Sequence, residues 1–242
     1  MTLRILSFDV GIVNLAYCLV EFNDNKKKII DWGVIDLMDI FLQKCTKCCC
    51  ISNGISCNDI AVNYVKKDNK IFGYCKKTKC QKTMKSIYNN SLIKKIKKVN
   101  TKSISLIDKT TELIRQLRGN DKLLTADVVV IENQPVLKNP VMKSIQMVIY
   151  SYFLIYGVTV DKPLNNIALF NAGKKFEFYE GPDIDCEHIK SEYSKRKYKS
   201  IKITEYLLNN DTENLHFFNK SKKKDDLADS YIQCLTYHKK NF

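Results

Sequence analysis

The chain has 242 residues, of which 45% are hydrophobic, so it is long enough and apolar enough to fold around one substantial core and is not a disordered chain. Its formal net charge of +14 favours a polyanionic partner. Ten Cys in a chain with no recognisable secretory signal favour metal ligands and buried thiols over disulfides.

No targeting or membrane segment is predicted. The first four residues lead directly into a strand, which leaves no room for a transit peptide. The longest apolar stretch, Ile145–Val160, contains Gln146 and Gly157 and is shorter than the roughly 18–20 residues that a membrane span needs. We therefore expect a soluble intracellular protein that is neither secreted nor membrane-bound.

The first part of the chain predicts a three-stranded meander followed by an insertion. Residues 3–10, Asn14–Glu21 and Lys28–Leu37 have the apolar pattern of strands, and a turn is expected between the last two. Residues 40–100 are dense in Cys and Lys and have weak apolar periodicity. We predict that they form an insertion within a single domain of residues 1–242.

The rest of the chain alternates helices and strands, which predicts an α/β fold with a mixed sheet flanked by helices. Asn139 and Pro140 suit a helix start, because Asn caps free N–H groups and Pro fits the first helical position. The elements expected in chain order are a helix over Ser103–Leu117, a strand over Asp127–Glu132, a helix from Pro140 to about Tyr156, a strand over Asn166–Phe170, irregular chain over 173–190, and helices over Ser194–Leu208 and Asp225–His238.

Acidic residues stand beside apolar elements in three separate places. Asp9 and Glu132 each end an apolar run, and Asp226 and Asp229 share one face of the last predicted helix. Carboxylates that converge from rigid elements can bind two Mg²⁺ for an in-line displacement at phosphorus. Helix capping explains Asp225 well and Asp226 in part, but not Asp229. In a basic chain, this pattern indicates phosphodiester chemistry.

Three segments carry a family resemblance: residues 8–17 (FDVGIVNLAY), 131–135 (IENQP) and 223–230 (KKDDLADS). In this order they resemble the signatures of RuvC-type Holliday junction resolvases, in the branch of poxviruses, other large DNA viruses and fungal mitochondria. Residues 139–143 and 193–197 also resemble family segments. The resemblance implies an RNase H-like fold, a homodimer, and metal-dependent paired nicking of four-way DNA junctions that leaves 5′-phosphate ends.

Carried over by motif, the resemblance implies that Asp9, Glu132, Asp226 and Asp229 are the catalytic metal ligands, with Asp225 in a supporting position. The expected cofactors are two Mg²⁺ per active site, with Mn²⁺ able to substitute. A bias toward Lys, Asn and Ile and the lack of a transit peptide favour the viral branch. We then expect a role in viral DNA recombination and replication-intermediate processing, in the host-cell cytoplasm or at a viral replication site.

Two cysteine pairs in the insertion, Cys45 with Cys48 and Cys75 with Cys80, have spacings that can close a tetrahedral thiolate site. We predict a structural Zn²⁺ held by these four residues. The alternative is a Cys-rich loop with reduced thiols. Three further cysteines leave the choice of ligands open: Cys49, Cys50 and Cys57.

Basic residues near the acidic motifs are expected to contact DNA phosphates, which positions the substrate without reading its sequence. Cations at the start of the helix from Ser194 oppose the helix dipole, a placement that phosphate binding would explain. A solvated surface is the alternative. The predicted residues are Lys138, Lys143, Lys195, Arg196, Lys197, Lys199, Lys222, Lys223 and Lys224.

The predicted helix from Pro140 to Tyr156 is apolar beyond its core face, so it is a candidate for the dimer interface. The alternative is that the insertion or a neighbouring helix covers this second face. The side chains on this second face are Met142, Met147, Tyr150 and Tyr156.

Three other functions fit parts of the pattern. An RNase H-like nuclease acting on RNA–DNA hybrids would share the fold and the metal chemistry. Residues 9–14 also resemble a phosphate loop of actin-like ATPases and sugar kinases, but the chain has only eight Gly and no second such loop. A non-enzymatic zinc-containing DNA-binding protein would leave Glu132 and the acids at 225–229 unexplained.

Overall fold

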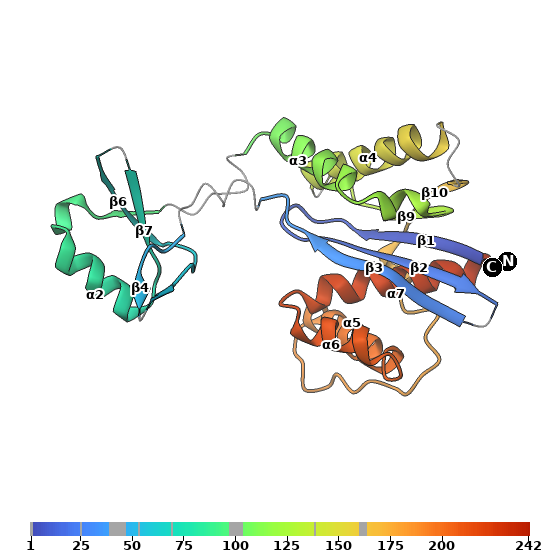
Figure 1. The fold of residues 1–242 in the computed structure, drawn as a ribbon. Coiled ribbons are helices and arrows are strands. Elements are labelled where there is room, and N and C mark those ends of the chain that lie inside the picture. Colours follow the sequence, from blue (N-terminus) through green and yellow to red (C-terminus); the bar gives the residue numbers. More distant parts are fainter. Residues whose placement is uncertain are drawn as a thin grey trace. The chain divides into compact units, whose positions relative to one another are not determined.

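The computed structural model describes residues 2–24, 26–38, 47–52, 54–68, 70–96, 104–137, 139–159 and 164–242. They form two compact units, shown in Figure 1: residues 1–37 together with 106–242, and residues 38–105. The second unit contains the segment that the sequence predicts as an insertion.

The first unit is built on a five-stranded mixed sheet. β1 (Thr2–Asp9), β2 (Leu15–Asn23) and β3 (Lys26–Ile35) form an antiparallel meander. β9 (Val128–Glu132) pairs parallel to β1, and β10 (Asn166–Phe170) pairs parallel to β9, which gives the order β10-β9-β1-β2-β3. The sheet and its flanking helices confirm the predicted fold class.

Helices cover both faces of this sheet (Figure 1). α3 (Leu106–Arg118) and α4 (Pro140–Phe153) lie on one face. α5 (Glu192–Leu207), α6 (Thr212–Lys220) and α7 (Lys224–Asn241) lie on the other. The sheet is therefore the middle of three layers, as an α/β fold requires.

Each face of the sheet buries its own core because side chains alternate along a strand. On β1, Leu6 and Phe8 belong to the core under α3 and α4, whereas Ile5 belongs to the core under α7. All three are fully buried. The sole Trp of the chain, Trp32 on β3, stacks on Phe218 of α6 at 5.5 Å between ring centroids.

α4 begins as the sequence predicts. The Asn139 side chain accepts a hydrogen bond from the Met142 N–H at 3.2 Å, and Pro140 follows at the first helical position. The helix continues into a π-helical turn, η4 (Leu154–Val158). The combined 19 residues are long and apolar enough to cross a membrane by length and composition, so the expectation that no segment is long enough was wrong. Core helices of soluble proteins meet the same criterion, and Ile145 and Ile149 of this helix are fully buried in the core.

The segment after β10 has little regular structure, as expected, apart from the short 3-10 helix η5 (Ala172–Lys174). A second 3-10 helix, η3 (Asp121–Thr125), leads into β9. α6 was not predicted from the sequence.

The second unit is a set of short elements. β4 (Ile51–Ser52) pairs with β5 (Ile55–Ser56). A separate antiparallel sheet has the order β7-β6-β8, and a helix and a 3-10 turn lie between β7 and β8 in the chain. Their bounds are β6 (Asn63–Lys67), β7 (Lys70–Tyr74), α2 (Thr78–Ile87), η1 (Asn90–Leu92) and β8 (Lys94–Lys95).

Candidate active site

Two of the predicted carboxylates stand at the ends of neighbouring parallel strands. Phe8 on β1 is paired with Ile131 on β9, so the next residues, Asp9 and Glu132, are the last residues of two neighbouring parallel strands. The backbone turns sharply after Asp9. A Cβ on Gly11 would lie 2.3 Å from the Asn14 carbonyl oxygen, so glycine is required for this close approach.

The other two predicted carboxylates, Asp226 and Asp229, lie near the start of α7. Gln233 of α7 connects the helix to the sheet by hydrogen bonds. Its buried side chain donates to the Phe8 carbonyl at 3.1 Å and to the Val130 carbonyl at 3.3 Å. These acceptors precede Asp9 and Glu132 by one and two residues. These two hydrogen bonds therefore hold α7 against the strand ends that carry Asp9 and Glu132.

The four carboxylates line one cavity of about 430 Å³, so the structure brings the predicted set together. Basic and aromatic side chains share this cavity. They are Lys175, Tyr193, Arg196 and Lys197. A phosphodiester backbone and a hard cation would each find complementary groups here.

The carboxylates repel one another. Burial, the negative charges of Glu132, Asp229 and Asp226, and a hydrogen bond with Glu132 together raise the pKa of Asp9 well above its ordinary value. Burial and the neighbouring charge of Asp225 also raise the pKa of Asp226. Crowding acids in this way is costly for the fold alone, and perturbed carboxyls in a cavity are typical of functional sites.

Hydrogen bonds orient two of the acids, Glu132 and Asp229. Glu132 accepts from the Gln134 side chain at 2.6 Å and from the Val10 N–H at 3.3 Å. Asp229 accepts from the Lys175 ammonium at 2.6 Å. By contrast, Asp226 Oδ2 is buried and accepts no hydrogen bond from the part of the chain that the structure describes.

This donor set fits divalent metal ions. All four side chains offer carboxylate oxygens, which Mg²⁺ prefers, and the orphaned Asp226 Oδ2 is a buried acceptor that only a cation or a water would satisfy. Mutual repulsion among the acids would be relieved by the same cations. Asp9, Glu132, Asp226 and Asp229 are thus the residues that would hold the metal.

Asp225 points to a different partner. It forms an ion pair with Lys197 of α5. Burial opposes ionisation of Asp225, but the Lys197 ammonium outweighs it and lowers the pKa of Asp225. Asp225 does not line the carboxylate cavity, which agrees with a supporting position rather than a ligand position.

Among the predicted DNA-contacting residues, Arg196 and Lys197 lie in the cavity with the acids. Lys197 also lies 4.8 Å from the Tyr193 ring centroid. Lys143 lies near the end of β9, where it donates to Asn133 at 3.0 Å. Lys138 lies outside the described residues.

The remaining predicted cations that the structure describes do not line the cavity. Lys195 pairs with Glu192 at 3.0 Å, and Lys199 lies over the Phe176 ring at 5.7 Å. Ahead of α7, Lys222 and Lys223 are exposed, and Lys224 donates to Asn219 at 2.8 Å.

Sequence reasoning missed Lys175 and Gln134. Gln134 lies within the IENQP segment, two residues beyond Glu132, so its proximity to the strand end was an available signal. Lys175 follows η5, five residues after the end of β10, a strand parallel to β9. A lysine just beyond a third parallel strand end is a weak signal, and only the fold places it against Asp229.

The cysteines of the insertion lie in the second unit. Cys48, Cys75 and Cys80 are close together, as predicted. Cys45 lies outside the described residues, and the fourth thiol beside the other three is that of Cys57.

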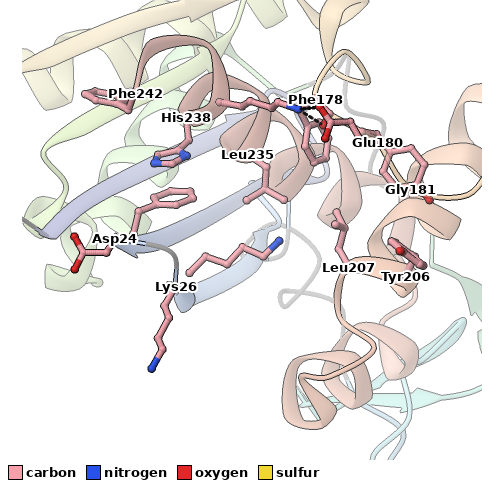
Figure 2. A pocket seen from close by; sticks show the side chains of 14 residues that line it. Asp24, Lys26, Phe178, Glu180, Gly181, Tyr206, Leu207, Leu235, His238 and Phe242 are labelled. Atoms are coloured by element: carbon pink, nitrogen blue, oxygen red, sulfur yellow. Dashed lines mark hydrogen bonds and ion pairs between the residues drawn. The ribbon is translucent and has the colours of Figure 1, made fainter.

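A second cavity, of about 680 Å³, is shown in Figure 2. Its wall includes Asp24 and Lys26 of the β2–β3 turn region and His238 near the end of α7. Asn23 is paired with Thr2, at the opposite end of β1 from Asp9. This second cavity contains none of the predicted site residues.

Known proteins resemble this chain in sequence. A protein-family model described as mitochondrial resolvase Ydc2 / RNA splicing MRS1 matches residues 5–136. An uncharacterized protein of Acanthamoeba polyphaga mimivirus is 32% identical, over 97% of this chain and 74% of that protein. The chain belongs to the mitochondrial resolvase Ydc2 / RNA splicing MRS1 family, as its resemblance to Holliday junction resolvases predicted.

Solved structures resemble the chain more distantly. The yeast mitochondrial Holliday junction resolvase Ydc2 is 16% identical, with 97% of this chain and 78% of that chain covered and a TM-score of 0.47. The fowlpox virus Holliday junction resolvase is 17% identical, with both chains fully covered and a TM-score of 0.47. Thermus thermophilus RuvC, solved with a Holliday junction substrate, is 8% identical, with 99% of this chain and 96% of that chain covered and a TM-score of 0.49.

Proposed function

We propose that this protein is a structure-specific endonuclease that resolves four-way DNA junctions by paired nicking and leaves 5′-phosphate ends. The observation that supports it best is the convergence of Asp9, Glu132, Asp226 and Asp229 in one cavity with Arg196 and Lys197. Membership of a family that includes a resolvase favours the same function.

Two Mg²⁺ held by these carboxylates, or Mn²⁺ in their place, would supply an activated water and stabilise the leaving oxygen at phosphorus. The chain itself keeps the ligands in position. Gln134 and the Val10 N–H hold Glu132, and Gln233 holds the helix that carries Asp226 and Asp229.

The cations beside the acids bind the DNA backbone in this proposal. Arg196 lines the cavity and is exposed, so its guanidinium is accessible to a phosphate, which arginine binds in a bidentate manner. Lys197 adds positive charge and is held by Asp225, so its ammonium stays near the cavity. Phosphate contacts position the scissile strand but do not recognise its base sequence.

The described part of each chain carries one carboxylate cluster, which can cut one strand. Two nicks therefore require two chains. A two-fold symmetric junction is most simply cut by a two-fold dimer with an isologous interface. α4 and η4 offer an apolar surface for a second copy, which keeps Met147 of the residues expected from sequence. Tyr150 and Tyr156 pack on the core and Met142 lines the cavity. The exposed stripe consists of Met147, Leu154, Ile155 and Val158.

A homodimer through this stripe is testable by sedimentation at micromolar concentration. Leu154→Asp places a charge in the apolar stripe and should shift the protein to monomer. Tyr206→Asp, on an exposed residue of the opposite sheet face, is the matched control and should leave the dimer intact. A Leu154→Asp variant that remains dimeric, or a wild-type monomer that still cuts junctions on both sides, contradicts the interface.

The nuclease assignment is tested with four labelled substrates of the same sequence: four-way DNA junction, linear duplex, RNA–DNA hybrid and structured RNA, each with Mg²⁺ or EDTA. We expect cutting of the junction, only with Mg²⁺, and resealing of the nicks by DNA ligase. Preferred cutting of the hybrid would indicate an RNase H-like activity. Tight RNA binding without any cutting would indicate a role like that of the RNA splicing protein in the family description.

A further inference from the structure

We propose that the second unit is organised around one structural Zn²⁺ bound by Cys48, Cys57, Cys75 and Cys80. The four Sγ atoms all lie within 4.8 Å of one another. Cys48, Cys75 and Cys80 are buried and Cys57 is half-buried, so the thiols face inward on a common point rather than lying on the surface.

The sulfur spacing is that of a tetrahedral thiolate site. With Zn–S bonds of about 2.3 Å, neighbouring sulfurs in a tetrahedron lie roughly 3.8 Å apart. Cys57 Sγ lies 3.7 Å from Cys75 Sγ and 3.9 Å from Cys80 Sγ. A disulfide needs about 2.05 Å between its sulfurs, and all four cysteines are free thiols. Four cysteines gathered at this spacing are arranged for a metal and not for oxidation in pairs.

The second unit has little else to hold it together. Its largest apolar cluster outside the cysteines buries only Val65, Tyr74 and Met84 among the described residues. Large aliphatic side chains stay exposed, among them Ile51 at 70% and Ile60 at 76%. A unit of this size with so small a core needs a covalent or metal cross-link to fold stably, and structural zinc supplies such folding energy.

The four ligands come from separate short elements, which the metal would join. Cys48 and Cys57 flank the β4–β5 hairpin, Cys75 follows β7, and Cys80 lies in the first turns of α2. Backbone bonds bring the first two segments together: the Cys48 N–H donates to the Asp59 carbonyl at 2.7 Å, and the Cys57 N–H donates to the Cys50 carbonyl at 2.8 Å.

Polar groups around the thiols fit a negatively charged tetrathiolate centre. The Lys77 ammonium lies 4.0 Å from Cys57 Sγ and is itself held by Asp59 at 2.9 Å. Gln81 donates to the Cys75 carbonyl at 2.5 Å and accepts from Asn63 at 2.8 Å. Partners of this kind orient metal ligands and offset their charge.

The proposed site differs in one ligand from the zinc site predicted from the sequence: Cys57 takes the place of Cys45. Cys49 is exposed, and Cys50 Sγ contacts the Cys80 carbonyl at 4.0 Å and is not part of the four-thiol group. Four soft thiolates in tetrahedral geometry select zinc or iron, and iron–thiolate centres, unlike zinc centres, absorb visible light, so the two metals can be told apart by experiment.

The test is metal analysis of full-length protein purified under reducing conditions without chelator. We expect about one Zn²⁺ per chain, as a four-ligand structural site requires, and no iron. Cys57→Ser and Cys75→Ser should each lose most of the zinc, whereas Cys45→Ser and the exposed Cys49→Ser should keep it. Cobalt substitution should give the visible absorption of a tetrahedral thiolate centre.

A second readout protects the test from variants that misfold. Stripping zinc from the wild-type protein should make residues 38–105 sensitive to protease, while residues 106–242 keep their resistance. Wild-type protein without zinc, protein containing iron instead, or zinc lost from Cys45→Ser but kept in Cys57→Ser each overturns the proposal. None of these measurements depends on nuclease activity.

Discussion

The ammonium of Lys175 lies 2.6 Å from a carboxylate oxygen of Asp229, so one member of the acidic cluster is paired with a cation of the chain itself. Thr236 of α7 donates to the Lys175 carbonyl at 2.6 Å, which fixes the lysine beside the helix that carries Asp229. The pair lowers the net charge of the cavity while leaving Asp226 Oδ2 without a partner among the described residues. If Asp229 is a metal ligand as proposed, we expect Lys175 to compete with the metal ion for it.

Replacing Lys175 with Gln should tighten Mg²⁺ binding. Removing one positive charge from the partly buried cluster favours the divalent ion by about 1 kcal/mol, or roughly five-fold in affinity. The measurement is the rise of the melting temperature with increasing MgCl₂, and Lys28→Gln on the exposed part of β3 is the control for overall charge. An unchanged or weaker affinity in Lys175→Gln would contradict this competition.

Asp9→Asn should stabilise the metal-free protein. Because the pKa of Asp9 is raised in the folded protein above its ordinary value of 3.8, the folded protein binds the proton more tightly than the unfolded chain. The stability that this group contributes is fully present at low pH and falls as the pH rises above 3.8 toward the raised pKa of the folded protein, so at neutral pH Asp9 destabilises the fold.

The variant removes this cost and should raise the melting temperature in EDTA at pH 7. Its stability should also depend less on pH above 4 than that of the wild type. Adding Mg²⁺ should stabilise the wild type but have little effect on Asp9→Asn. A lower melting temperature for Asp9→Asn in EDTA would show that repulsion among the acids is not the dominant effect.

Arg196→Gln should weaken both junction binding and the dependence of that binding on salt. A protein that binds one phosphate fewer has a slope of log affinity against log salt that is smaller by about one. Binding is measured by fluorescence anisotropy over a series of salt concentrations, in Ca²⁺ or EDTA to prevent cleavage. Lys28→Gln removes the same charge at a distance from the cavity and should leave the slope nearly unchanged. If both variants have equal slopes, Arg196 does not contact phosphate.

Gly11→Ala should damage both stability and cleavage. The added Cβ would lie 2.3 Å from the Asn14 carbonyl oxygen, so the turn beside Asp9 must move. A cost of about 1–3 kcal/mol is expected from backbone strain of this kind. Gly119→Ala is the control, because its Cβ would approach backbone atoms no closer than 3.4 Å. Denaturant unfolding of the two variants, followed through Trp32 fluorescence, measures the difference, and equal stability would refute the requirement for glycine.

Strand ends made the acidic site predictable. Each buried parallel strand is a short apolar run, so Asp9 and Glu132 could be recognised as the residues where such runs stop. The predicted strand Asn166–Phe170 has the same bounds in the structure. What the sequence did not contain was the pairing of β9 with β1, which is a contact between segments more than 100 residues apart.

Side chains that act through long-range contacts were beyond prediction for the same reason. Lys175 has no local feature that separates it from other lysines in a basic chain, and only the packing of α7 brings it to Asp229. The missed helix α6 did have a local signal, because Asp211 caps it by accepting from the Asn214 N–H at 3.1 Å. In the insertion, the spacing of cysteines indicated a metal site but could not choose between Cys45 and Cys57.

The most direct test of the proposed function is cleavage of a supercoiled plasmid that extrudes a cruciform, because paired nicking and single nicking give different products. Wild-type protein with Mg²⁺ should convert the plasmid to linear DNA with ligatable ends at the cruciform. Asp226→Asn, which removes the negative charge of Asp226 and keeps its size, should bind the cruciform without cutting it. A wild-type protein that leaves the plasmid intact or only nicks it, or an Asp226→Asn variant with full activity, would contradict the account.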